Sequence, residues 1–385
     1  MKRINTDIFK KINLKYFLFI SAFLLFSTAK SQHDGHAQNS TPHDSAAFGH
    51  TESVGHGHNE EEETFSAATM GNMIMHHIRD DYFWHFFDIG GKHYTLYLPI
   101  IAYNKDLGLQ IFSSKHIAHG EAFKGLTYNH GHLALESGND HAVYDFSITK
   151  NVASMILSLI ILCLIFITVA KSYAKRGLKA PKGLQSFMEP LILFVRDEIA
   201  KPNLGRKANA FTPYLLTLFF FIWINNLLGL LPGAANLTGN ITVTVCLALL
   251  TLILTNMNGN KHYWGHIFWP PGVPLPIKFI LIPVEIVGIL TKPFALLIRL
   301  FANITAGHII ILSILSLIFL FGESGKNAIG GFGASAVAIP FAVFLYCLEL
   351  LVAALQAFIF TMLTALFIGQ ASADHEHHAE EGAHH

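Results

Sequence analysis

An arginine inside a long apolar stretch constrains this chain more than any other feature. Residues 293–320 read PFALLIRLFANITAGHIIILSILSLIFL, a run long enough to cross a bilayer and charged only at Arg299. A charged side chain at the centre of a membrane helix costs about 2.5–3.5 kcal/mol, and Arg cannot discharge itself by losing a proton. Arg299 is therefore a candidate functional residue. The alternative is that its guanidinium reaches the membrane surface along its own aliphatic stem.

Polar residues continue along the same predicted helix face. Glu285, Lys292 and Arg299 are spaced by seven residues, and Asn303 follows one turn later. Seven steps of about 100° return almost to the starting direction, so the four side chains form one stripe. Arg299 lies about 10 Å deeper than Lys292 at about 1.5 Å per residue.

The composition is that of a polytopic membrane protein. Of 385 residues, 52% are apolar and 14% are charged, and mean hydropathy is +0.42. The formal net charge of zero gives no reason to expect a nucleic-acid partner. Three cysteines all fall inside apolar spans, where they act as small hydrophobic residues, and no metal or cofactor site is expected.

The N-terminal part divides into three predicted segments. Residues 1–31 carry several lysines, an apolar run and a small-x-small site, which predicts a cleaved signal peptide, with an uncleaved anchor as the alternative. Residues 32–64 are polar and rich in histidine, which predicts a disordered segment, with weak divalent-metal binding as the alternative. Residues 65–147 regain apolar content and predict a small α+β subdomain outside the cytoplasm. Within it we expect a helix over Met70–Phe87 and strands over Tyr94–Tyr103, Leu107–Phe112 and His141–Ile148.

The membrane domain is predicted over residues 148–370. A cluster of lysines and an arginine follows the first span, which fixes that end as cytoplasmic and the N-terminal region as external. Asn225 and Asn226 lie inside the second span, where they more often join helices than conduct ions. A short interfacial helix is expected over Leu184–Ala200. The first three spans are Val152–Ala170, Phe211–Leu231 and Ile241–Leu254.

The last two apolar stretches are too long for simple crossings. Ile277–Phe321 would measure about 67 Å as one helix and Ala334–Gly369 about 54 Å, against a hydrocarbon core of about 30 Å. Either both break, near Pro293 and Pro340, or both are steeply inclined. The fold class is an all-α polytopic membrane protein of five to six helices with two long C-terminal helices. Residues 371–385 form a polar cytoplasmic tail.

The second long stretch adds a further set of polar residues. Glu349 and Gln356 are seven residues apart and share a face. His308 lies nine residues after Arg299, about 180° around the helix and about 13 Å along it. A His308–Glu349 pair could relay protons, or could simply hold two helices together. Gln356 could orient the guanidinium of Arg299, or equally could join two helices.

These residues carry a family resemblance. The segments TKPFALLIRLFANITAGHIIIL and LELLVAALQAFIFTMLTALFI, with FTPYLLTLFFFIWINNLLGLLPG before them, resemble the a subunit of the membrane sector of rotary ATP synthases. The likeness covers roughly Asp145 to Gln370. It implies a stator subunit whose last two helices lie inclined against a ring of c subunits. The expected partners are the c-ring, the peripheral-stalk b subunits, the soluble F1 sector indirectly and the lipid bilayer.

The resemblance also assigns roles. It implies that Arg299 faces the ring carboxylate between two half-channels, that Asn303 and Gln356 are its polar neighbours, and that Glu285 is a channel acid. Many bacterial relatives carry an acid at the position of His308 and a histidine at that of Glu349. The two types are exchanged here, which suggests that the pair works as a couple.

The expected function is proton translocation coupled to rotation in the bacterial inner membrane. The chain lacks a GxxxxGK[ST] phosphate loop, so it is not expected to bind nucleotide. Two rivals remain at this level. A secondary cation transporter should show internal repeats, and a divalent-metal transporter fed by the histidine-rich segment should show ligand clusters within the spans.

Overall fold

The computed structural model describes residues 80–89, 92–105, 107–118, 122–129, 132–135, 143–176, 180–231, 235–322 and 326–373. The predicted signal peptide and the histidine-rich segment lie outside these residues, as do positions 65–79 and most of the predicted tail.

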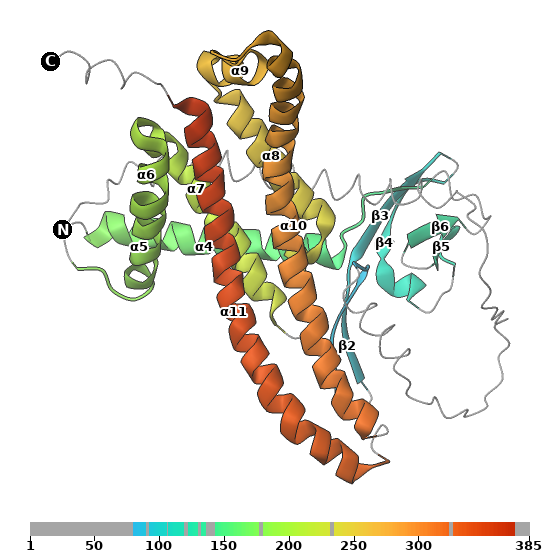
Figure 1. Cartoon of the computed structure of the whole chain (residues 1–385). Helices are drawn as coiled ribbons and strands as arrows, with labels where there is room; N and C mark the ends of the chain where they lie inside the picture. The colour runs from blue at the N-terminus through green and yellow to red at the C-terminus, as the bar shows by residue number, and fades with distance from the viewer. Residues whose placement is uncertain are drawn as a thin grey trace, which may run out of the picture.

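The membrane domain consists of helices (Figure 1). Four helical segments are long and apolar enough to cross a membrane: Lys150–Lys175, Leu184–Gly229, Leu275–Phe321 and Ala328–Ser372. A fifth crossing results if α8 and α9, which are bent by 105°, count as one span. Four to five such segments fit the predicted all-α polytopic membrane protein. The helical elements are α4 (Lys150–Arg176), α5 (Leu184–Phe194), the π-helical turn η3 (Val195–Ala200), α6 (Lys201–Leu204), η4 (Gly205–Lys207), α7 (Ala208–Gly229), η5 (Leu237–Gly239), α8 (Ile241–Met257), α9 (Lys261–Phe268), α10 (Leu275–Phe321) and α11 (Ala328–Ser372).

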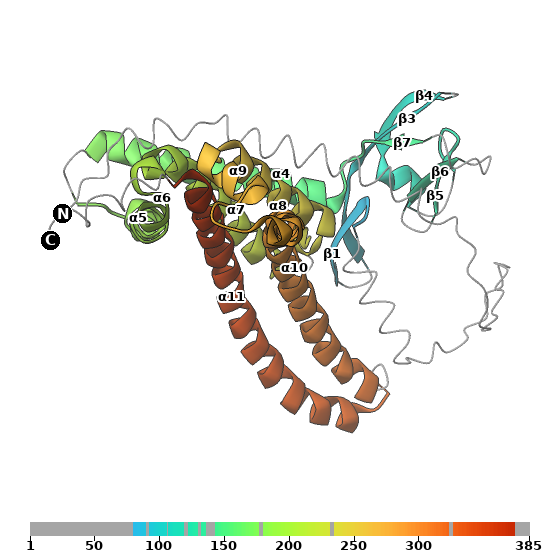
Figure 2. The same cartoon turned by 45° about the horizontal axis from the view of Figure 1, so that its top comes forward.

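The two long stretches are continuous helices. α10 runs for 47 residues through Pro283 and Pro293, and α11 for 45 residues through Pro340. They pack side by side as an antiparallel pair, and α11 bends along its length (Figures 1 and 2). The predicted alternative of breaks at Pro293 and Pro340 is therefore wrong, since the helix can continue past a proline when neighbouring helices support it. The inclined alternative remains.

Helix α7 forms the centre of the bundle and packs against α4, α11 and η3. Leu215, Phe220 and Phe221 are almost completely buried. The ring of Phe220 meets that of Phe166 in α4 edge to face, with centroids 5.2 Å apart. The Asn226 amide donates a hydrogen bond of 3.1 Å to the carbonyl of Ala353 in α11. This confirms that Asn226 joins two helices.

Helix α5 and the turn η3 together coincide with the helix predicted over Leu184–Ala200. One face of this segment enters the core through Met188, Ile192 and Val195, while Phe187 and Phe194 remain exposed. Arg196 is buried and donates two hydrogen bonds of 2.9 Å to Asp197. The helix is thus confirmed, and its location at the membrane interface stays a prediction.

The N-terminal subdomain is built from strands. Its described elements are β1 (Phe83–Ile89), β2 (Lys92–Tyr97), β3 (Pro99–Asn104), β4 (Gly108–Ser113), the 3-10 turn η1 (Ser114–Ile117), β5 (Leu126–Asn129), β6 (His132–Leu135) and β7 (Tyr144–Asp145). They form three antiparallel sheets of order β1-β2, β4-β3-β7 and β5-β6. The β5-β6 hairpin supplies Leu126, Leu133 and Leu135 to a core shared with β3 and β4.

The structure corrects several predicted elements of this subdomain. Positions 83–87 of the expected helix Met70–Phe87 belong to strand β1, because aromatic residues paired across a hairpin with β2 favour a strand over a helix. Positions 70–79 lie outside the described residues. The strand expected over Tyr94–Tyr103 is split between two sheets at Leu98, and that over His141–Ile148 is reduced to β7. Strand β4 confirms the strand expected over Leu107–Phe112.

A polar junction fixes this subdomain to α4. The Asp80 carboxylate accepts a hydrogen bond of 3.1 Å from the backbone N–H of Asn151, and the backbone N–H of Lys150 donates to the carbonyl of Asp81 at 2.9 Å. Two N–H groups at the start of the helix are thereby satisfied from outside the helix. Burial raises the pKa of Asp80 above its ordinary value. Since β7 leads into α4 within five residues, the subdomain and the first membrane helix are joined at one point.

Candidate functional site

His308 and Glu349 meet between the two long helices. Nδ1 of His308 in α10 lies 3.6 Å from Oε1 of Glu349 in α11, and the side chains are 15% and 5% exposed. Both carboxylate oxygens of Glu349 are buried without a hydrogen-bond partner. The two helices thus bring an imidazole and a carboxyl group, both able to bind protons, within 4 Å of each other.

Gly307 makes room for the carboxylate of Glu349. A Cβ atom added at Gly307 would lie 2.7 Å from Oε1 and 3.0 Å from the carboxyl carbon of Glu349. Real Cβ atoms do not approach other atoms so closely. The absence of a side chain at position 307 thus lets α11 bring Glu349 against α10 beside His308.

Arg299 occupies the middle of α10 on its uncovered side. Its side chain is exposed, as is that of Asn303 one turn later. Within the described residues Arg299 forms no hydrogen bond or ion pair. Three small exposed residues lie on the same side: Ala295, Ala302 and Ala306. Small residues allow a neighbouring helix to approach closely. This side of α10 therefore presents a lone cation on a surface suited to another helix.

Gln356 lies at the level of this cation. The ammonium of Lys292 in α10 lies 5.5 Å from the ring centroid of Phe367 in α11, and His308 contacts Glu349. These two contacts define the register of α10 against α11. Because the helices are antiparallel, each step forward along α11 matches one step back along α10. Starting from either contact, Gln356 lies opposite positions 301–303, within about one turn of Arg299. Gln356 is buried, and no hydrogen bond joins it to Arg299.

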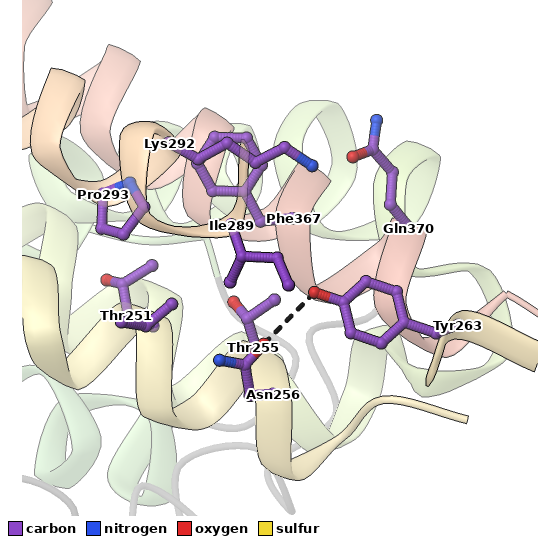
Figure 3. Close-up of a pocket in the computed structure, with 10 residues that line it drawn as sticks. Thr251, Thr255, Asn256, Tyr263, Ile289, Lys292, Pro293, Phe367 and Gln370 are labelled. Carbon is purple, nitrogen blue, oxygen red and sulfur yellow. Dashed lines mark hydrogen bonds between the residues drawn. The ribbon is translucent and has the colours of Figure 1, made fainter. Parts of the chain in front are cut away.

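A small cavity lined by both polar and apolar side chains lies on the other side of Arg299 along α10 (Figure 3). Its walls come from α8, α9, α10 and α11. The phenol of Tyr263 donates a hydrogen bond of 3.2 Å to Oδ1 of Asn256, and the hydroxyls of Thr251 and Thr364 lie 3.4 Å apart at its edge. The polar lining residues are Thr251, Thr255, Asn256, Tyr263, Lys292 and Gln370. These residues of α8 and α9 are not among the predicted site residues, although Thr251 and Thr255 lie four positions apart and so share a helix face.

Glu285 belongs to the same end of α10. It is partly buried and lies close enough to the phenol of Tyr263 for an electrostatic interaction. Because α10 is continuous, Glu285, Lys292, Arg299 and Asn303 do share one stripe. Arg299 thus lies between two polar sites. The His308–Glu349 pair is about 13 Å away along the helix in one direction, and Lys292 of the cavity is about 10 Å away in the other.

The sequence of the helical region matches a known family. The family model described as ATP synthase A chain matches residues 152–369, which is more than half of the chain. The chain belongs to this family.

Individual relatives extend the match. A protein named ATP synthase subunit a from Chlorobium phaeobacteroides (strain BS1) is 47% identical over 63% of this chain and 70% of its own length. ATP synthase subunit a 2 from Chlorobaculum tepidum is 40% identical over 80% of this chain and 75% of its own. ATP synthase subunit a from Pelodictyon phaeoclathratiforme is 38% identical over 94% and 92%, respectively.

The N-terminal subdomain has a separate match. The model of a domain of unknown function, DUF8433, covers residues 73–154. It ends within the first turn of α4, where the polar junction of Asp80 and Asn151 lies. Among the described residues, no group of three or more His, Cys, Asp or Glu side chains comes together as a metal site.

Proposed function

We propose that this chain is the proton-translocating stator subunit of a rotary ATP synthase, and that it works against a rotating ring of c subunits. The observation that carries the proposal is the exposed, unpaired guanidinium of Arg299 at the midpoint of a membrane helix. A permanent cation in that setting needs a negative partner or water. A carboxylate carried past by another subunit is the partner that fits a surface lined with alanines.

The two flanking polar sites support a route for protons on either side of Arg299. Protons enter from outside the cell at His308 and Glu349, which are close enough to pass a proton, and then neutralise a ring carboxylate. After rotation, the carboxylate releases its proton through the cavity at Lys292 and Tyr263. Arg299 forces this ionisation, since it favours the charged carboxylate and cannot itself carry protons across.

The remaining assignments follow from the same proposal. Asn303 and Gln356, at the level of Arg299, orient the guanidinium, and Glu285 gives the exit cavity an acidic group. The N-terminal subdomain lies outside the cell and the C-terminus inside, as the basic cluster after α4 indicates. Peripheral-stalk b subunits hold the chain still, and the F1 sector converts rotation to ATP synthesis. Each proton moving inward contributes about 2.3 kcal/mol per 100 mV of membrane potential.

The test is the variant Arg299→Ala in the complete complex. Inverted membrane vesicles are supplied with ATP, and proton uptake is followed with a pH-sensitive dye, after the variant complex has been shown to contain all its subunits. The proposal predicts no ATP-driven uptake. The control is Arg206→Ala, which removes an exposed arginine of η4 outside α10 and should leave proton uptake unchanged. Normal uptake by an assembled Arg299→Ala complex would refute the proposal.

A further inference from the structure

The three-stranded sheet of the N-terminal subdomain is apolar on both faces. Its inner face packs into the subdomain core through Ile100, Ala102 and Phe112. The opposite face, here called the outer sheet face, should be polar if it met only water. Its side chains instead are large, apolar and 42–60% exposed: Tyr103 (43%), Leu109 (60%), Ile111 (58%), Tyr144 (42%) and Phe146 (55%).

The strand register makes these residues one continuous patch. Tyr103 pairs with Leu109 on one side and with Tyr144 on the other. Ile111 faces Ile101 in the next pair on the same face. Among the described positions of β3, β4 and β7, none on this face carries a charge. Contiguous exposed apolar surface of this kind marks an interaction site.

The patch lies where the chain enters the membrane. Phe146 is four residues before Lys150, the first residue of α4, and so at most about 13 Å from it at about 3.3 Å per residue. The β5-β6 hairpin covers the inner face on the side away from the membrane helices. In Figure 1 the β3-β4 sheet lies on the side of that hairpin nearer the helices. The outer sheet face is therefore turned toward the side from which α4 leaves.

The chemistry of the patch fits a lipid surface. Tyrosine is enriched at the boundary between hydrocarbon and water, because its ring is apolar and its hydroxyl is polar. Exposed lysines follow the strands at opposite ends of the sheet, Lys105 after β3 and Lys115 after β4. Lysines that border an apolar patch attract the phosphates of anionic headgroups.

We propose that the outer sheet face rests on the bilayer, in the headgroup region of the leaflet at which α4 begins. Leu109, Ile111 and Phe146 dip into the boundary, and the tyrosines and the two lysines contact headgroups. The subdomain then lies flat against the membrane instead of extending into the aqueous phase. The placement does not depend on the proposed proton route.

The test measures which reagent reaches a label on this face. The complete complex is placed in nanodiscs of phosphatidylethanolamine and phosphatidylglycerol, with the three native cysteines of this chain replaced by alanine. A nitroxide is attached at Ile111→Cys or, separately, at Leu109→Cys, both exposed positions outside the core. The matched control is Ala122→Cys, an exposed residue next to the β5-β6 hairpin. Spin relaxation by oxygen, which concentrates in lipid, is compared with relaxation by a water-soluble nickel chelate.

We expect the ratio of oxygen to nickel relaxation at positions 109 and 111 to exceed that at position 122 several-fold. Two results would overturn the proposal. A ratio equal to that of the Ala122→Cys control would mean that the face meets water. Protection from both reagents would mean that protein, either another part of this chain or another subunit, covers it.

Discussion

Exchange of His308 and Glu349 tests whether the two side chains act as one unit. His308→Glu alone would place two carboxylates within about 4 Å, and Glu349→His alone would place two imidazoles there. At the observed separation of 3.6 Å, two unit charges interact with about 4–5 kcal/mol at an effective dielectric constant of about 20. Where both groups are charged, each single variant turns this attraction into repulsion, and the double variant restores it.

The measured coupling will be smaller than the Coulomb value, because one group of a like-charged pair can neutralise itself. Contacting residues typically show interaction energies of about 0.5–3 kcal/mol. Since about 1.4 kcal/mol corresponds to a factor of ten in rate, the double variant should pump roughly 2- to 150-fold faster than the product of the two single effects predicts. ATP-driven proton uptake into inverted vesicles, normalised to the amount of assembled complex, gives the four rates.

A matched control uses the same types of substitution without the contact. Glu285→His combined with His308→Glu exchanges an acid and a histidine that lie 23 positions apart on α10, about 35 Å along the helix. This pair should behave additively. If the exchange of His308 and Glu349 proves equally additive, the close approach of these two side chains has no functional consequence. The hypothesis that they act as one unit is then refuted.

Two further changes test the packing around these groups. Gly307→Ala would place a methyl group 2.7 Å from Oε1 of Glu349, so the end of that side chain must shift; relative to Gly288→Ala, which gains the same helix propensity, this should cost up to about 1–3 kcal/mol, visible as a lower Tm of the solubilised complex. Gly288→Ala on the same helix meets no atom within 4 Å and should be neutral or stabilising, so equal Tm values for the two would contradict the packing. Asp80→Ala removes the acceptor for the Asn151 N–H at the start of α4, which should cost about 0.5–2 kcal/mol. Limited proteolysis of the subdomain should then be about 2- to 30-fold faster. Asp80→Asn keeps an acceptor oxygen and should change the cleavage rate little. Unchanged cleavage of the alanine variant would refute the role of this contact.

The spans could be predicted from the sequence because the bilayer sets a length and a polarity that few residues violate. α7 and α8 begin and end within three residues of their predicted limits, whereas α4 continues six residues beyond its predicted end at Ala170. The continuity of α10 and α11 could not be predicted, because a proline such as Pro293 or Pro340 removes one hydrogen bond and neighbouring helices decide whether the helix survives. Strand β1 escaped prediction for a related reason, since its partner β2 and not its own spacing determines its conformation.

The candidate site shows the same division. Spacing within one helix correctly grouped Glu285, Lys292, Arg299 and Asn303, because the 3.6-residue period is local. The pairing of His308 with Glu349 was predicted from the chemistry of the two side chains. The register that creates the contact depends on how α11 fits against Gly307, which no spacing within either helix reveals. The cavity at Tyr263 is formed by residues of four separate helices and was not predicted from the sequence.

The central claim is that the exposed side of α10 around Arg299 faces a ring carboxylate. It is tested most directly by disulfide formation between Ala302→Cys, exposed one turn from Arg299, and a cysteine placed one turn from the carboxylate of the ring subunit. Ile304→Cys, which is 2% exposed on the covered side of the same helix, is the control. The account predicts rapid cross-linking at position 302 and none at position 304. Absence of a cross-link at position 302 in an assembled complex, or equal cross-linking at both positions, would contradict it.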